Sequence, residues 1–194
     1  MAGTPEQQPR RPTPWRLVGI VLLVVVALAV AGVLIARHTG GKSNASTTTT
    51  TTATVTPFGP LAVTPATLHG FAAALGRPIY WKGPVQGYTY ELTETTTGNV
   101  FVRYLPPGVR VGDKRAAFDV VGTYPYANAL AALKAVPHAQ IDHLADGGVV
   151  VSTTADPKSV HIAYPGVDYQ IEVYDPIPGR ARETALSGRV RQIR

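Results

Sequence analysis

The chain has 194 residues, a formal net charge of +6 and not one cysteine. Without cysteine, disulfides, cysteine-ligated zinc, thiol catalysis and a lipid anchor on cysteine are excluded. The charge is unevenly spread, because the residues from Pro57 onward contain 13 Lys and Arg against 11 Asp and Glu. So balanced a surface does not suit the tracking of a phosphate backbone, and nucleic acid is not an expected partner.

Residues 17–36 form an uninterrupted apolar run without a charged side chain. A helix of this length spans about 30 Å, the thickness of the hydrocarbon core of a bilayer. The run is longer than the roughly 7–15 apolar residues of a secretory signal, which favours an uncleaved transmembrane helix over a cleaved signal peptide. The sequence thus predicts the lipid bilayer as one partner, contacted through residues 17–36.

The segments on either side of this run lack a periodic apolar pattern. Residues 1–16 contain three arginines and are predicted to be a disordered cytoplasmic tail. Residues 37–57 are a Ser/Thr-rich linker without acidic residues, a composition typical of solvated stalks. The predicted topology places the N-terminus in the cytoplasm and a domain of residues 58–194 outside the cell membrane. An exported domain without disulfides fits a bacterial cell envelope.

Residues 58–194 have the size of one ordinary domain. Pro65 after Thr64, followed by apolar residues at helical spacing up to Gly76, predicts a helix. Thr97-Gly98 and Asp156-Pro157 are predicted to be the turns of two β-hairpins. The predicted elements, in chain order, are a helix over 65–75, strands over 79–81, 88–95, 99–105 and 117–124, a helix over 126–136, strands over 148–154, 160–164 and 169–174, a helix over 178–186 and a strand over 190–193. We expect an α+β fold with an antiparallel sheet and two or three helices.

The two halves of this domain have the same predicted order of strand, strand, strand and helix. VFVRYLPPG at 100–108 can be laid over VHIAYPG at 160–166, and FDVVGTYP at 118–125 over YQIEVYDP at 169–176. The pattern favours a duplicated unit that would give a sheet with pseudo-two-fold symmetry and with the helices on one face. The alternative is that a shared β-hairpin pattern produces the few identities.

The stretch GRPIYWKGPVQGYTYELTETTTGNVFVRYL at 76–105 continues into PPG and, further on, into VGTYPYANALAALKA. These segments resemble a family of uncharacterised actinobacterial proteins in which a single transmembrane helix anchors a small extracytoplasmic domain. The resemblance covers most of residues 58–194. It implies an envelope location and a single-pass topology, and it brings no activity and no catalytic residue with it.

The best local candidate for a metal site combines His138, Asp142, His143 and Asp146. The spacing of the two histidines is not that of a zinc pair on one helical turn. In an extended segment, Asp142 and His143 would point to opposite sides. We interpret the segment as a polar connector, and the sequence predicts no metal and no cofactor.

Catalytic patterns are equally weak. The chain contains no Gly-x-Ser-x-Gly, and its serines have no matching base in the sequence. Glu91 and Glu172 alternate with apolar neighbours, which predicts that both lie on the solvated side of a sheet instead of forming a glycosidase pair with Glu94. No catalytic residue is predicted.

Aromatic residues offer the more promising pattern. Tyr80, Trp81 and Tyr126 lie at element edges, beside Gly83-Pro84 or Pro125, and we predict that they bind a ligand. The alternative is a core built from aromatics that favour β-structure. The predicted function is a membrane-anchored extracytoplasmic binding or scaffolding module of the bacterial cell envelope, whose partner is an envelope polymer or another envelope protein. The alternative is a cell-envelope hydrolase.

Overall fold

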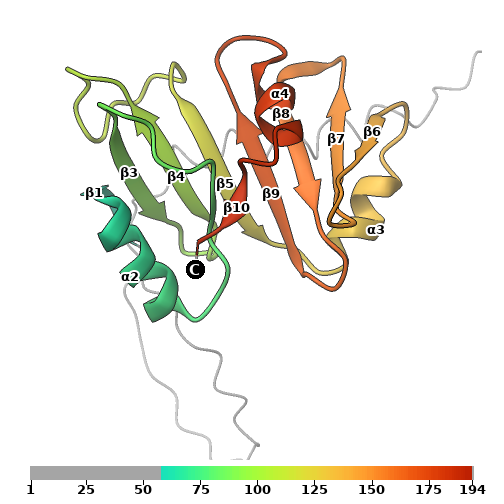
Figure 1. Ribbon diagram of the computed structural model, residues 1–194, viewed down its shortest axis with the longest axis horizontal. Coiled ribbons are helices and arrows are strands. Elements are labelled where there is room, and N and C mark those ends of the chain that lie inside the picture. Colours follow the sequence, from blue (N-terminus) through green and yellow to red (C-terminus); the bar gives the residue numbers. More distant parts are fainter. Residues whose placement is uncertain (1–57, 194) are drawn as a thin grey trace, which may run out of the picture. The chain divides into compact units, whose positions relative to one another are not determined.

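The computed structural model describes residues 58–193, and within them the chain forms an α+β domain (Figure 1). The elements are β1 (Phe58–Val63), α2 (Pro65–Leu75), β2 (Tyr80–Trp81), β3 (Thr89–Glu94), β4 (Val100–Leu105), β5 (Asp119–Pro125), α3 (Ala129–Lys134), β6 (Gln140–His143), β7 (Val149–Thr153), β8 (Asp156–Ala163), β9 (Tyr169–Tyr174), α4 (Arg180–Leu186) and β10 (Arg191–Gln192). The predicted cytoplasmic tail, transmembrane segment and linker lie outside the described residues. Over residues 58–193, no helix combines the length and apolar character needed to cross a membrane.

Eight of the strands form one antiparallel sheet in the order β1-β3-β4-β5-β9-β8-β7-β6. The two central strands, β5 and β9, belong to different halves of the domain, and each half adds its strands outward from this pair. Strands β2 and β10 pair separately as a short antiparallel ribbon. The predicted α+β fold with an antiparallel sheet and two or three helices is confirmed for this part of the chain, where three helices are described.

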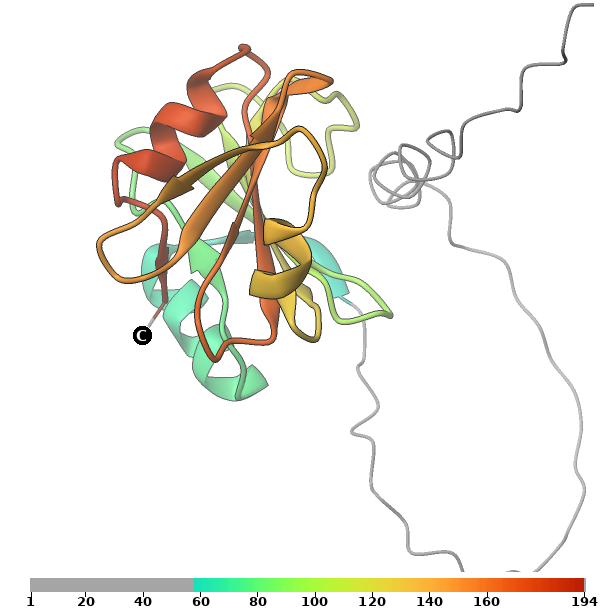
Figure 2. The ribbon, with the colours of Figure 1, turned by 90° about the vertical axis from the view of Figure 1, so that its right-hand side faces the viewer.

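One face of the sheet, which we call the core face, carries the main hydrophobic core. Its buried side chains, among them Leu92, Val102, Val121 and Ile171, pack with buried residues of α2, α4 and the β2–β10 ribbon. Figure 2 shows α2 and α4 on one side of the sheet and α3 on the other, so the prediction that the helices share one face is wrong. The core face is therefore covered along most of its width.

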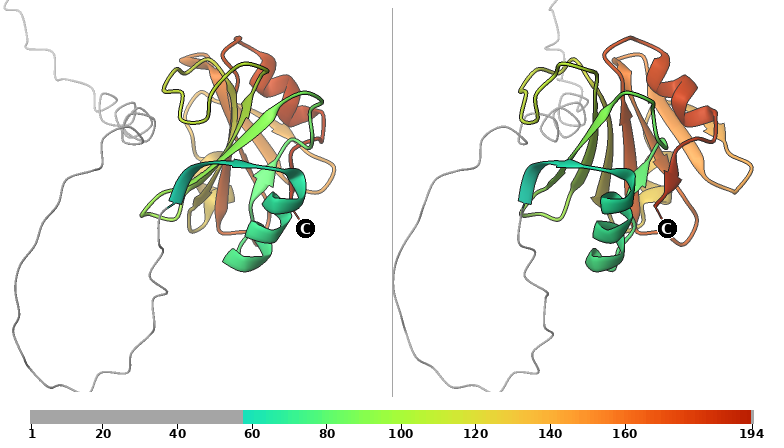
Figure 3. Two further views of the ribbon diagram at one scale, coloured as in Figure 1. Left: turned by 90° about the vertical axis from the view of Figure 1, so that its left-hand side faces the viewer. Right: turned by 60° about the vertical axis from the view of Figure 1, so that its left-hand side comes forward.

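The opposite face, which we call the polar face, is covered only in part. Helix α3 packs on its β7–β8 side through Ala129 and Leu133. The loop between β4 and β5, yellow-green in both views of Figure 3, lies on the side of the sheet away from α2 and α4. Between these two covers, several side chains of β4, β5, β8 and β9 are partly exposed.

The sequence explains the best-predicted helix in detail. The Thr64 side chain accepts a hydrogen bond from the N–H of Thr67 at 3.1 Å and so caps α2, while Pro65 starts it. Gly76 ends it at φ 61°, a left-handed conformation that favours glycine. The predicted helix over 65–75 is confirmed, as is the hairpin of β3 and β4.

Other elements differ from the prediction. Strands β1 and β6, at the two edges of the sheet, were not predicted, because β1 contains Gly59-Pro60 and β6 is short and polar. The second hairpin turns at Thr154-Ala155, since Asp156 already pairs with Thr153 at the start of β8. Helix α3 covers only 129–134 of the predicted 126–136.

Candidate functional site

The three aromatic residues predicted to bind a ligand lie in different environments. Tyr80 and Trp81 form β2 and are only 5% and 8% exposed, whereas Tyr126, just after β5, is 48% exposed. The ring of Tyr80 stacks on Tyr164 with centroids 5.8 Å apart, and Trp81 meets Tyr90 edge to face at 6.0 Å. The first two residues thus belong to the core, and Tyr126 is the member of the set that a ligand can reach.

Two glutamates predicted to lie on a solvated face are buried instead. Glu91 is 2% exposed and Glu172 is 9% exposed, and both lie on the polar face. The prediction is wrong because strand alternation tells which side chains share a face, and not whether a loop or neighbouring side chains cover that face. A buried carboxylate must find partners inside the protein, and the two glutamates find different ones.

Glu91 is part of a charged tie between the sheet and the β4–β5 loop. One carboxylate oxygen accepts a hydrogen bond from Nη1 of Arg103 at 2.5 Å, directly across the β3–β4 pair. The other accepts from the backbone N–H of Gly112 in the loop, also at 2.5 Å. The Arg103 guanidinium also lies over the ring of the buried Phe118. The charge of Glu91 is therefore neutralised by the protein itself.

Glu172 has a different set of partners. Its two carboxylate oxygens accept hydrogen bonds from the hydroxyl of Tyr124 at 2.5 Å and from Oγ of Ser159 at 2.7 Å. Burial and the neighbouring Glu172 carboxylate raise the pKa of Tyr124, which keeps its hydroxyl protonated and able to donate. We call Tyr124, Ser159, His161, Gln170 and Glu172 the Glu172 cluster.

The position of the Tyr124 ring depends on a glycine, Gly122, which leaves room for it. Gly122 pairs directly with Glu172 across the β5–β9 ladder and lies two residues before Tyr124 on the same face. A Cβ atom at Gly122 would lie 2.8 Å from Cε2 of the Tyr124 ring, so only glycine lets this ring fold back across β5. Phe101 on β4 packs edge to face against the same ring at 5.6 Å.

His161 completes the cluster from β8, where it pairs directly with Glu172. Burial lowers the pKa of His161, although the charges of Glu172 and Asp156 act in the opposite direction. Nε2 of Gln170 lies 2.8 Å from Nδ1 of His161. An amide nitrogen can only donate, so Nδ1 accepts and the neutral ring carries its proton on Nε2.

This geometry does not make a serine nucleophile. Ser159 donates its proton to Glu172, and over residues 58–193 no hydrogen bond joins Ser159 to the His161 ring. A nucleophile–base pair needs the hydroxyl proton to face a base that is itself oriented by a third group. What the Glu172 cluster offers is an oriented carboxylate with neutral neighbours.

A second group of ionisable side chains lies on the core face where β5 begins and β9 ends. Lys82 forms an ion pair with Asp119, and its Nζ lies 4.4 Å from the centroid of the Tyr104 ring. Burial, together with the charge and hydrogen bond of Asp119, raises the pKa of Asp175, against the backbone N–H of Ile177, which lowers it. We call Lys82, Asp119 and Asp175 the Lys82 cluster; in it, two carboxyl groups and one ammonium group lie close together.

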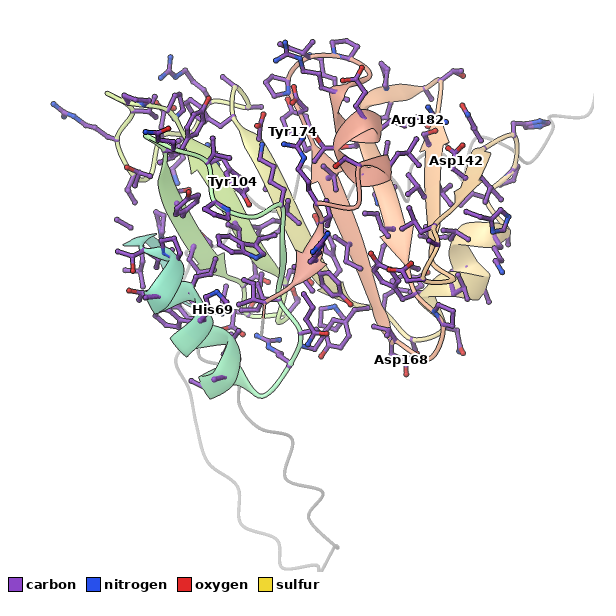
Figure 4. The ribbon with its side chains drawn as sticks, in the orientation of Figure 1. His69, Tyr104, Asp142, Asp168, Tyr174 and Arg182 are labelled. Atoms are coloured by element: carbon purple, nitrogen blue, oxygen red, sulfur yellow. The ribbon has the colours of Figure 1, made fainter. Side chains whose placement is uncertain are left out.

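The segment considered as a metal site is used differently. Asp142 on β6 accepts two hydrogen bonds from Nη2 of Arg182 on α4, at 2.7 and 2.8 Å, and the two side chains face each other in Figure 4. In the part of the chain that the structure describes, no group of three or more His, Asp and Glu side chains is placed to hold a metal ion.

Comparison with known proteins adds no relative: no family model matches the chain, and neither a curated protein nor a solved structure matches it. The site therefore rests on its own geometry. For the Glu172 cluster, the sequence predicted a solvated position for Glu172 and no base partner for any serine. Only the alternation in β9 hinted at the shared face, because the pairing of β5 with β9 joins segments far apart in the chain.

Proposed function

We propose that the chain is a single-pass membrane protein of a bacterial cell envelope whose extracytoplasmic domain binds an envelope polymer or another envelope protein. The apolar run at 17–36 and the resemblance to anchored actinobacterial proteins support the location. The observation that supports binding is the polar face. There, partly exposed Phe101, His161 and Gln170 surround a carboxylate that is held in place by hydroxyl groups.

The anchor can be tested by itself. Full-length protein should remain in the membrane fraction after carbonate extraction, because a helix of this length inserts stably. A soluble mature form that begins within residues 17–36 would overturn the anchor and leave the binding proposal to be judged separately.

The binding role can be tested by photo-crosslinking of the full-length chain in intact cells. A photoreactive residue at Phe101 should give a crosslinked product, since this position lies partly exposed on the polar face. Ile177, which is 46% exposed but lies outside that face in the turn after β9, provides the matched control. Equal products from both positions, or products from Ile177 alone, would contradict a partner on the polar face.

The alternative, a cell-envelope hydrolase, is favoured by one observation, the paired carboxyls of the Lys82 cluster. A carboxyl with a raised pKa beside an ionised one can serve as an acid–base pair. If this alternative holds, the protein releases soluble fragments from isolated cell wall and Asp175→Asn abolishes the release. Release that is absent from wild type, or unchanged by the substitution, would exclude this role for the Lys82 cluster.

We also propose that the eight-stranded sheet arose from a duplicated unit of strands and helix. The mirrored strand order on the two sides of the β5–β9 pair supports this. The residue-by-residue overlay differs by one position, however: Val100 pairs with Thr123, whereas Tyr174, the overlay partner of Thr123, pairs with Ser159 and not Val160. Aligning the two halves of this chain with each other tests the proposal, because similarity no higher than that of shuffled sequences would overturn it.

A further inference from the structure

Among the carboxylates with little exposure in residues 58–193, Glu172 differs from most of the others in its lack of an ion pair. Most of them face a cation: the ion pairs are Glu91 with Arg103, Glu94 with Arg77, Asp113 with Arg115, Asp119 with Lys82, and Asp142 with Arg182. Asp175 lies beside Asp119, which carries the Lys82 ion pair. Within residues 58–193, no ion pair reaches Glu172, and the imidazole beside it is kept neutral by burial. The Glu172 cluster thus holds a negative charge that its described neighbours do not neutralise.

The hydrogen bonds of the Glu172 cluster define what can complete it. The hydroxyls of Tyr124 and Ser159 each donate their one hydrogen bond to the carboxylate. Their oxygen lone pairs therefore remain as acceptors. Each carboxylate oxygen can accept more than the one hydrogen bond it has. Nε2 of Gln170 is engaged with His161, which leaves the Gln170 carbonyl oxygen as a further acceptor. Because hydrogen-bond acceptors dominate the cluster, a ligand that binds it must supply several hydrogen-bond donors.

The surroundings also favour a cation of a particular kind. Tyr124 and Phe101 meet edge to face beside the carboxylate, and aromatic faces attract cationic groups. Glu172 is 9% exposed, so only a small head group can reach it. A primary ammonium group is small, positively charged and carries three donors, whereas a quaternary ammonium carries none.

We propose that the Glu172 cluster binds a primary ammonium group, with Glu172 as its counter-charge and the oxygens of Tyr124 and Ser159 as additional acceptors. The inference rests on the proposed function, since it names the chemistry of the ligand taken by the polar face. Two kinds of envelope component present this group, an amino sugar with a free amine and an amino acid with a terminal amine on its side chain.

The test uses the full-length chain in detergent micelles and four probes. Glucosamine and Nα-acetyl-lysine amide represent the two sources of the ammonium group. N-acetylglucosamine and tetramethylammonium are the controls, since the first lacks the charge and the second lacks the donors. We expect saturable binding of at least one of the first two probes and of neither control. Binding of both amines marks the ammonium alone as the recognised feature, while binding of one identifies the source.

The variants locate the binding in the Glu172 cluster. Glu172→Gln keeps the shape of the side chain and should weaken binding at least tenfold, while Glu183→Gln, at an exposed glutamate of α4, should not change it. As a measurement that needs no folded variant of Glu172, NMR signals of the His161 ring should shift on addition of the bound probe to wild type. Signals of the His143 ring, on the exposed end of β6, should stay.

Three results would overturn the inference: no binding of either amine at millimolar concentration, equal binding by Glu172→Gln, or equal binding of N-acetylglucosamine. If such a result occurs while crosslinking at Phe101 still succeeds, the polar face binds a partner of other chemistry and the proposed function stands. If crosslinking fails while the amines bind, the ammonium site exists and the proposed envelope partner is wrong.

Discussion

Glu91 and Glu172 lie on the same face of one sheet, and both are buried, yet they are held in opposite ways. Glu91 accepts hydrogen bonds from a guanidinium and from a loop amide, so its charge is neutralised and it holds the β4–β5 loop against the sheet. Glu172 meets two hydroxyls and a neutral imidazole, so its charge is positioned but not neutralised. The difference teaches that burial alone does not make a carboxylate functional; the kind of partner distinguishes a structural tie from a candidate site.

The loss of stability expected for a buried and for an exposed aromatic side chain gives a scale for the effects of the two glutamates. Trp81→Ala removes a buried aromatic side chain and should lower the free energy of unfolding by about 3–5 kcal/mol. Tyr126→Ala, at an exposed ring, should change it by no more than about 0.5 kcal/mol. Urea unfolding monitored by circular dichroism measures both. Similar losses for the two variants would mean that Trp81 does not contribute to the core as the structure has it.

Removing the Arg103 cation that pairs with Glu91 should lower the free energy of unfolding about as much as Trp81→Ala does. Arg103→Met leaves a buried carboxylate without its counter-charge, a change that typically costs about 3–5 kcal/mol. Adding Glu91→Leu should recover much of the loss, because the double variant no longer buries a charge. A double variant as unstable as Arg103→Met would show that the unpaired charge is not the main cause of the loss.

The hydroxyl partners of Glu172 should matter less than Arg103 does for Glu91. Tyr124→Phe removes one hydrogen bond to a charged group and keeps the ring over Gly122, so a loss of about 1.5–3 kcal/mol is expected. Tyr174→Phe, which removes a hydroxyl that donates to a backbone carbonyl near the surface, is the matched control and should cost less. The comparison fails if Tyr124→Phe destabilises the domain more than Arg103→Met.

The smallest effect concerns pH. Because the pKa of His161 is lowered by burial, the unfolded chain takes up a proton on this ring at higher pH than the folded chain does. The free energy of unfolding should therefore fall as the pH decreases through the ordinary histidine value of 6.5. His161→Gln should reduce the difference in stability measured at about pH 7.5 and pH 5.5. An unchanged difference would assign the pH dependence to other groups.

The local parts of the fold could be predicted from the sequence. The pairing of Glu91 with Arg103 was also within reach of sequence analysis. The turn over residues 96–98, where the Thr95 N–H donates to the Asn99 carbonyl, sets the register of β3 and β4, and this register places Glu91 opposite Arg103. A cross-strand pair of opposite charges was therefore present in the hairpin prediction itself. What the sequence could not show is that the loop carrying Gly112 folds over the pair and buries it.

The Glu172 cluster could not be predicted in the same way. Its members come from β5, β8 and β9, and the pairing of β5 with β9 has no turn to set its register. One residue of slip would move Glu172 to the core face and Ile171 to the polar face. The burial of Tyr80 and Trp81 was equally hidden, since β2 pairs with β10 at the far end of the chain.

The central position of β5 and β9 also has a consequence for how the domain is made. Every other adjacent pair in the eight-stranded sheet joins strands from the same half of the domain, whereas β5 must wait for β9. During synthesis at about 5–20 residues per second, the 43 residues between the end of β5 and the start of β9 leave the free edge of β5 exposed for a few seconds. An unpaired strand edge can pair wrongly with another chain, so the nascent domain is most prone to association at β5, a strand that lies at the centre of the finished sheet.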